Sequence, residues 1–483
     1  MKIVKLLAFS AALVLSAFAV WFGSLNQDEG WYLYAARMVS EGYMPYRDFF
    51  YTQGPLMPIV YSLFGWVWNS WGLLGARIMT AVVGLISIFF SVALARRLVP
   101  DSKAEQRCAA GMIVFLTLAC NLYHLYYVAI PKTYALASLF VVVGFYLYSF
   151  VDRRPAIAAM GSAFVFALAA GTRISLGAIL AIVGITLLVR RRWRAAAFFA
   201  LGGALALAVV YGPFLFDAGA RAGLVAAQQY HASRGGYDIV WTVGSISRLV
   251  RWYLPIFVVL ALGFGVKASP MLRTLAAAFA AVFAVQMMAP FPYEDYQVPV
   301  MALVAVYAAV KFAERASSNL VRATLLTMAM AFCCSFGSPL LEKWMTNGQD
   351  RFWSIKKEKS ELAQLREVAL IINQLDPGGK DLLTQDTYLA IETGRRVPRG
   401  LEMGPFSMLT DEQWKRLIND APCRIAAMSG YTFAVEPPRC NERAIEKQLE
   451  YWKMLKKKYR YLIKEDYFGQ NATTLLVMER IEK

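Results

Sequence analysis

The sequence predicts a polytopic α-helical membrane protein that ends in a polar α/β domain. Of the 483 residues, 58% are hydrophobic and only 17% are charged, whereas an ordinary soluble protein has about 25% charged residues. The apolar residues fall in repeated, nearly uncharged runs, and a helix needs about 20 such residues to cross a bilayer. A soluble enzyme, a disordered protein and a disulfide scaffold are therefore excluded.

The apolar runs predict about eleven transmembrane helices. The first run, from Leu6 to Gly23, is longer than the roughly 7–15 apolar residues of a signal peptide, so we interpret it as a retained anchor. The predicted spans are 4–24, 73–95, 108–128, 132–150, 156–172, 174–189, 195–216, 252–267, 272–290, 298–313 and 321–340.

The basic residues predict the orientation. Lys2 and Lys5 precede the first span, and Lys and Arg then recur in alternate loops, at 96–107, 153–154, 190–194, 267–273 and 311–322. Cytoplasmic loops carry excess positive charge, so we expect a cytoplasmic N-terminus in the cell inner membrane and an extracytoplasmic C-terminal domain. The net charge of +17 is concentrated in the membrane part, with no basic groove interleaved with aromatic residues, so no nucleic-acid partner is expected.

Two domains are predicted: a transmembrane domain at 1–340 and an extracytoplasmic α/β domain at 341–483. The long outside loops of the first domain are 25–72 and the polar segment 217–251. In the second domain, turn and capping patterns predict a helix near 356–375, a strand at 381–384, a helix from the Thr410 cap to about 419, a strand near 424–428 and a hairpin across 469–471.

The first outside loop is rich in aromatic residues, which account for thirteen of its 48 residues. Amphipathic rings favour the membrane interface. Trp31, Tyr34 and Met38 share one helical face, which predicts a short helix along the membrane. Gly54-Pro55 opens a second helix, expected from Leu56 to Trp68.

An acidic pair, Asp28 and Glu29, follows directly after the first span. A carboxylate at this water-facing rim can accept a proton from a hydroxyl or amine nucleophile. Asn26 and Glu29 also have the spacing of a capping box. The residues alone therefore favour a structural role for Glu29 and leave the role of Asp28 open.

The anchor, the acidic pair, the two interfacial helices with the turn at 53–56 and the many spans that follow together resemble the GT-C glycosyltransferases. The likeness is to the bacterial branch of protein-O-mannosyltransferase-like and aminoarabinose-transferase-like enzymes. It covers 1–340 by topology, and its specific motif lies in 26–61. The resemblance implies that a monosaccharide moves, with inversion, from a polyprenyl-phosphate donor to an extracytoplasmic glycan, lipid or protein acceptor. It implies that Asp28 is the catalytic base and that Glu29 is the second acidic position of the catalytic pair.

The implied donor leaves as a phosphate monoester, whose developing negative charge needs basic partners. The candidate phosphate-binding residues at the outer rim are Arg173, Lys132, Arg251 and Arg248. Arg173 ranks first, because its loop is too short to leave the helix bundle. For each of these residues alone, snorkelling to the lipid headgroups is the alternative.

The candidate substrate-binding residues are Tyr32, Arg47, Gln53, Glu294 and Asp295. Arg47 also fits a simple pair with Asp48, and the acidic pair at 294–295 also fits a helix cap or a site for a divalent cation. No other cofactor is expected, and the metal ligands are left unassigned.

Two departures from the family pattern leave the donor's identity open. The aminoarabinose branch typically has Lys where Gly54 precedes the Pro-Leu turn, and many relatives have an acidic residue where Lys132 begins the fourth helix.

Two other functions stay open. A transporter or flippase of a lipid-linked substrate would place ionisable residues near the bilayer midplane. A polysaccharide polymerase or ligase would use a large mid-chain outside loop.

Overall fold

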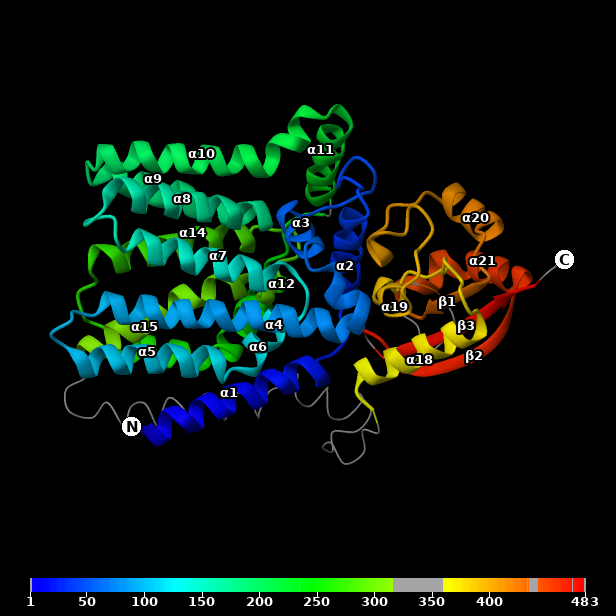
Figure 1. Cartoon of the computed structure of the whole chain (residues 1–483), viewed down its shortest axis with the longest axis horizontal. Coiled ribbons are helices and arrows are strands. Elements are labelled where there is room, and N and C mark those ends of the chain that lie inside the picture. The colour runs from blue at the N-terminus through cyan, green and yellow to red at the C-terminus, as the bar shows by residue number, and fades with distance from the viewer. Residues whose placement is uncertain are drawn as a thin grey trace.

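The computed structural model describes residues 2–233, 235–315, 359–431, 433, 442–470 and 472–481. The helices up to residue 315 form a bundle, and the residues from 359 onward lie beyond one end of it (Figure 1). The long helices of the bundle run side by side, whereas α2 and α11 lie across their ends, on the side that faces the C-terminal part (Figure 1).

The bundle is built from fifteen α-helices and two short 3-10 helices within the described residues. They are α1 (Lys2–Phe22), α2 (Gln27–Ser40), α3 (Leu56–Ser62), α4 (Gly65–Leu98), α5 (Ala104–Ala119), α6 (Leu122–Ala129), α7 (Thr133–Tyr148), α8 (Pro155–Thr172), η1 (Ile174–Leu176), α9 (Gly177–Val189), α10 (Trp193–Phe216), α11 (Ala218–Ala232), α12 (Ile239–Trp252), α13 (Leu254–Leu262), α14 (Pro270–Met287), η2 (Glu294–Gln297) and α15 (Val298–Arg315).

The apolar helices confirm a polytopic membrane fold. By length and composition, five helices of the described residues could cross a membrane, or up to eight if each bent pair of helices is one span. Two shorter apolar helices, Thr133–Tyr148 and Ile174–Val189, add to these. Of the five, the span that ends in α15 is the most buried, and it packs at the centre of the apolar core.

Ten of the predicted spans coincide with helices, and the eleventh, at 321–340, lies outside the described residues. The run at 108–128 is not one straight helix: α5 and α6 meet at a bend of 69°, where the Asn121 side chain accepts from the backbone N–H of His124 and starts a new helix. The run at 252–267 contributes only α13, which meets α12 at a bend of 76°.

The second outside loop differs from its prediction. The polar segment 217–251 folds largely as α11 and α12. Asp217 and Asp238 cap these helices, because each side chain accepts from backbone N–H groups of the first turn. Local side-chain capping of this kind stabilises helices in otherwise polar segments.

The first outside loop holds the predicted interfacial helix as α2, but the helix expected over 56–68 is shorter. It ends as α3 at Ser62, and α4 then begins at Gly65 and is kinked at Gly72. Gly72 has a φ of +60°, and a Cβ there would collide with the Glu392 carboxylate. That carboxylate accepts from the backbone N–H of Leu73 at 2.8 Å, so the C-terminal part caps the long arm of α4.

The C-terminal part is a small α/β unit. It contains α18 (Glu361–Leu375), α19 (Thr387–Thr393), η4 (Gly404–Phe406), α20 (Asp411–Asp420), β1 (Ile425–Ser429), α21 (Glu442–Lys458), β2 (Tyr459–Phe468) and β3 (Thr473–Arg480). The strands form an antiparallel sheet in the order β1-β3-β2, with Ile425 opposite Glu479 and Tyr459 opposite Arg480.

Most predicted elements of this unit are present. Thr410 opens α20 with a complete capping box, and β2 and β3 form the expected hairpin, although Asn471 in its turn lies outside the described residues. The segment 381–384 is not a strand, because it makes only isolated bridges, including Leu383 to Ala426. The predicted boundary at 340/341 lies outside the described residues, so the division into two domains stays a prediction.

Candidate active site

A charged cavity of about 680 Å³ lies where α2 crosses the ends of the bundle helices. It draws its polar residues from elements that are far apart in the chain. Asp28 is in the first turn of α2, Lys132 caps α7, Arg173 joins α8 to η1, and Asp295 lies in η2. Tyr32, Gln53 and Glu294 also line the cavity.

The Asp28 carboxylate faces this cavity and has two close partners. Its Oδ2 lies 2.7 Å from Lys132 Nζ, and its Oδ1 accepts from Trp31 Nε1–H at 3.0 Å. Asp28 lies outside the spans, on the helix that crosses their ends. Burial raises the pKa of this carboxyl, but the Lys132 ammonium, with smaller contributions from the Trp31 N–H and Arg173, outweighs burial and holds the pKa below its usual value. Asp28 is therefore ionised at neutral pH.

Lys132 bridges two carboxylates. Its Nζ lies 2.7 Å from Asp28 and 3.4 Å from Asp295 Oδ2, and the side chain is almost fully buried. The Tyr134 hydroxyl donates to the same Asp295 oxygen at 2.9 Å. A buried ammonium requires such paired charges.

The same bridge bears on the candidate divalent cation. The ammonium lies between the two carboxylates that could have shared a metal ion. Glu294, the other acidic residue of the predicted pair, is engaged by Arg248. No group of three or more His, Cys, Asp or Glu side chains within the described residues is arranged to hold a metal. The residues present therefore do not fit a divalent cation.

Arg173 is buried in the cavity wall with an unused donor. Its Nη1–H donates to Thr133 Oγ1 at 3.2 Å, and its guanidinium lies over the rings of Tyr134 and Tyr296. The buried Nε has no hydrogen-bond partner in the described structure. Leaving a buried charged donor unpaired is costly, so this wall suits an anionic ligand.

Gly54 brings the first outside loop directly against the loop that carries Arg173. A Cβ at Gly54 would collide with the carbonyl oxygen of Gly171. Only a residue without a side chain allows this contact, so the glycine at the family's lysine position has a packing role here.

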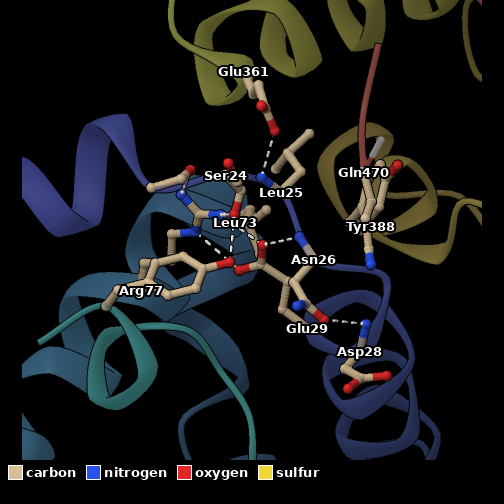
Figure 2. Close-up of polar contacts among 12 residues, drawn as sticks. Ser24, Leu25, Asn26, Asp28, Glu29, Leu73, Arg77, Glu361, Tyr388 and Gln470 are labelled. Atoms are coloured by element: carbon tan, nitrogen blue, oxygen red, sulfur yellow. Dashed lines mark hydrogen bonds and ion pairs between the residues drawn. The ribbon is translucent and has the colours of Figure 1, made fainter. Parts of the chain in front are cut away.

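Glu29 does not line the cavity and is fully buried, and Figure 2 shows its side chain beside Arg77. Its two carboxylate oxygens accept from Arg77 Nε–H at 2.9 Å and Nη2–H at 2.5 Å, and Oε1 also accepts from the Asn26 backbone N–H at 2.9 Å. Arg77 also donates to the carbonyls of Val20, Gly23 and Ser24. The structure does not bring Glu29 to the cavity beside Asp28: its contacts fix the break between α1 and α2, and a catalytic role for Glu29 stays a prediction.

Three other candidates do not reach the cavity. Arg47 is exposed and pairs with Asp48 and Asp217. Arg251 lies over the ring of Trp252, and Arg248 contacts the site only through its ion pair with Glu294 at 3.0 Å. Charged groups in loops and at helix ends readily find partners nearby, so charge and position alone do not mark a cavity residue.

The C-terminal part completes the site, which the sequence did not predict. Met403, Phe406, Tyr431 and Gln470 line the cavity. Gln470 Oε1 accepts from the Gln27 backbone N–H at 2.8 Å. Glu361 Oε2 accepts from Leu25 N–H at 2.7 Å, and Figure 2 shows both residues beside the turn that carries Asp28.

The fold, an apolar bundle with an acidic turn after α1 and a charged cavity at its end, is shared by solved structures of the GT-C class. The fold is similar to that of ArnT from Cupriavidus metallidurans in the apo state, with a TM-score of 0.68 and 15% identity over 99% of this chain and 98% of that one. The same protein bound to undecaprenyl phosphate gives a TM-score of 0.62 at 14% identity, with the same coverage of both chains.

A third structure extends the comparison. The oligosaccharyltransferase of Archaeoglobus fulgidus, in complex with Zn and sulfate, has a TM-score of 0.54 and 11% identity over 96% of this chain and 72% of that one. No protein-family model and no curated protein sequence matches the chain. At these identities the comparisons establish the GT-C fold that the first outside loop predicts.

Proposed function

We propose that this protein is a membrane glycosyltransferase. It moves a monosaccharide from a polyprenyl-phosphate donor to an extracytoplasmic glycan, lipid or protein acceptor. The observation that carries the proposal is the cavity that joins an ionised carboxylate, Asp28, to two buried cations, Lys132 and Arg173. The fold is also that of ArnT, a protein that binds undecaprenyl phosphate.

In this proposal, Arg173 and Lys132 bind the donor phosphate. Arg173 offers a buried, unpaired Nε–H to the cavity, and guanidinium groups match phosphate oxygens well. The Lys132 ammonium lies between the carboxylates of Asp28 and Asp295. A phosphate that attracts the ammonium weakens its hold on Asp28 and so makes the carboxylate a stronger base.

The transfer is a single displacement. The acceptor's hydroxyl or amine attacks the anomeric carbon, and Asp28 takes the proton that the nucleophile loses. The bond between the anomeric carbon and the phosphate oxygen breaks, and its electron pair leaves with the polyprenyl phosphate. The two cations offset the charge that develops there. The new bond forms on the opposite face, so the configuration inverts.

The remaining features follow from the same proposal. The protein lies in the cell inner membrane, where its membrane lipids surround the bundle, with a cytoplasmic N-terminus and the cavity outside. Tyr32, Gln53, Glu294 and Asp295 line the cavity and contact the sugar or the acceptor. The described C-terminal part belongs to an extracytoplasmic domain at 341–483, which covers the acceptor side.

The test follows the loss of sugar from radiolabelled polyprenyl-phosphate sugars in membranes that hold equal amounts of protein. We expect turnover with the wild type and with Asp48→Asn, which removes an acidic group of the same loop that does not line the cavity. Asp28→Asn abolishes turnover. Equal turnover by Asp28→Asn and wild type would rule out Asp28 as the base. A lack of turnover in all three, across many sugars, would overturn the proposed activity.

A further inference from the structure

A second cavity lies at the end of the bundle opposite Asp28. α4 starts beside α2 and runs to this far end (Figure 1). The cavity has a volume of about 420 Å³ and lies where α4 ends, α5 begins and α7 turns into α8. We call it the arginine cavity, because Arg96, Arg97, Arg107 and Arg153 line it.

The arginine cavity is short of negative charge. Asp101 is the only acidic group among the described residues that line it, and it pairs with Arg107. Arg97 Nε–H donates to Ser149 Oγ at 2.7 Å, and its guanidinium lies 3.4 Å from the centre of the Phe150 ring. Each guanidinium has five N–H donors, so these contacts use only part of the supply.

An apolar stripe on α4 leads into this cavity. Val82, Ile86 and Phe89 are exposed and share one face of a helix. Ala93 and Arg96, both in the cavity wall, continue the same spacing. Exposed apolar side chains on a membrane-spanning helix face lipid chains, and the stripe therefore connects lipid chains with a basic pocket at the membrane boundary.

We propose that the arginine cavity binds the phosphate headgroup of an anionic phospholipid, with the acyl chains along the α4 stripe. Arginine forks match phosphate oxygens in pairs, and basic pockets between transmembrane helices suit phospholipid headgroups. A free phosphate ion shares the headgroup chemistry, but it leaves the apolar stripe without a ligand. This site is independent of the proposed glycosyl transfer.

The test measures lipid retained by the purified full-length protein in detergent, by native mass spectrometry. The probes are phosphatidylglycerol and the zwitterionic phosphatidylcholine. The variant Arg96→Gln/Arg153→Gln removes two charges of the cavity. Each arginine near an anionic lipid is worth about fivefold in affinity, so we expect this variant to bind phosphatidylglycerol about 25-fold more weakly, with phosphatidylcholine unchanged.

The matched control, Arg191→Gln/Arg194→Gln, removes two exposed arginines at the same end of the bundle, one in the loop after α9 and one in the first turn of α10. It is expected to bind like the wild type. If phosphatidylglycerol binding weakened equally in both double variants, the loss would come from net charge and not from this cavity, and the proposed site would be overturned. Displacement of the lipid by millimolar inorganic phosphate would overturn the choice of a lipid. If the double variant does not fold, as judged by thermal unfolding, the single variants test the same point at about fivefold each.

Discussion

The two sides of the first turn of α2 place adjacent acidic residues in opposite environments. On one side, Asp28 faces a cavity and pairs with the Lys132 ammonium. On the other side, Glu29 is sealed against Arg77, whose guanidinium also holds three carbonyls at the end of α1. The two adjacent carboxylates therefore differ in access: Asp28 can meet a ligand in the cavity, whereas Glu29 is sealed in a buried ion pair.

The C-terminal part also makes hydrogen bonds to the segment that leads into α2. Leu25 N–H donates to Glu361, and Gln27 N–H donates to Gln470. The Gln27 side chain also donates to Asp386 at 2.5 Å. The backbone N–H groups of Leu25 and Gln27 thus find acceptors far away in sequence. The position of Asp28 therefore depends on the C-terminal part as well as on α1 and α4.

The largest expected effect separates the two carboxylates by activity. In Asp28→Asn we expect a loss of about 10²- to 10⁴-fold in kcat, which is typical of removing a general base. We expect only a small loss of thermal stability, because Asp295 still pairs with the Lys132 ammonium and a neutral amide in the cavity still accepts from Trp31. Turnover of polyprenyl-phosphate sugar and thermal unfolding, measured on the same preparation, check both parts. A large drop in melting temperature would instead make Asp28 a structural residue.

The second prediction is that a change in the buried Glu29–Arg77 pair lowers stability. Arg77→Met leaves the buried Glu29 carboxylate without its partner, which costs about 3–5 kcal/mol of stability. Thermal or denaturant unfolding in detergent measures this loss. We expect the double variant Glu29→Gln/Arg77→Met to regain much of it, since no buried charge is left. A double variant as unstable as the single one would show that the bonds of Arg77 to the α1 carbonyls dominate.

These contrasts show what sequence reasoning can and cannot reach. The spans and the acidic turn were predictable, because apolar runs and capping patterns are local. Lys132 and Arg173 were predictable as cations at breaks between apolar helices, and both line the cavity. Arg77 had a signal that we did not use, since a lone arginine inside an apolar run must have a buried partner.

Other parts of the site have no local signal. Gln470 and Glu361 act on the turn at 25–27 across more than 300 residues of sequence. The pattern at 469–471 predicts a hairpin turn but not the long-range partner of Gln470, and Glu361 has no motif that points to Leu25. The candidates that lie outside the cavity show the converse. Arg47 and Arg251 have the right charge at the right rim, but nearby groups engage them.

The third prediction concerns pH and the exchangeable partner of Asp28. Lys132 holds the pKa of Asp28 below its usual value, so the ionised base persists into mild acid. In Lys132→Gln burial acts without this opposing charge, and the pKa of Asp28 rises. The acidic limb of the kcat/KM profile therefore moves to higher pH. A profile that keeps its acidic limb while overall activity falls would limit Lys132 to binding the donor.

The smallest expected effect tests the link between the C-terminal part and Asp28. Gln470→Ala removes the acceptor of the Gln27 N–H, and one such hydrogen bond is worth about 1 kcal/mol, or roughly fivefold in rate if the loosened turn misplaces the base. Because Gln470 acts on the turn and not on the phosphate cations, we expect kcat to fall while donor binding stays the same.

The exposed Gln374→Ala serves as the control in the same part of the chain. Equal kcat in the two variants would mean that the other contacts of the turn, with Arg77, Glu361 and Asp386, hold it in place without Gln470. A weaker affinity for the donor would instead place Gln470 on the donor itself.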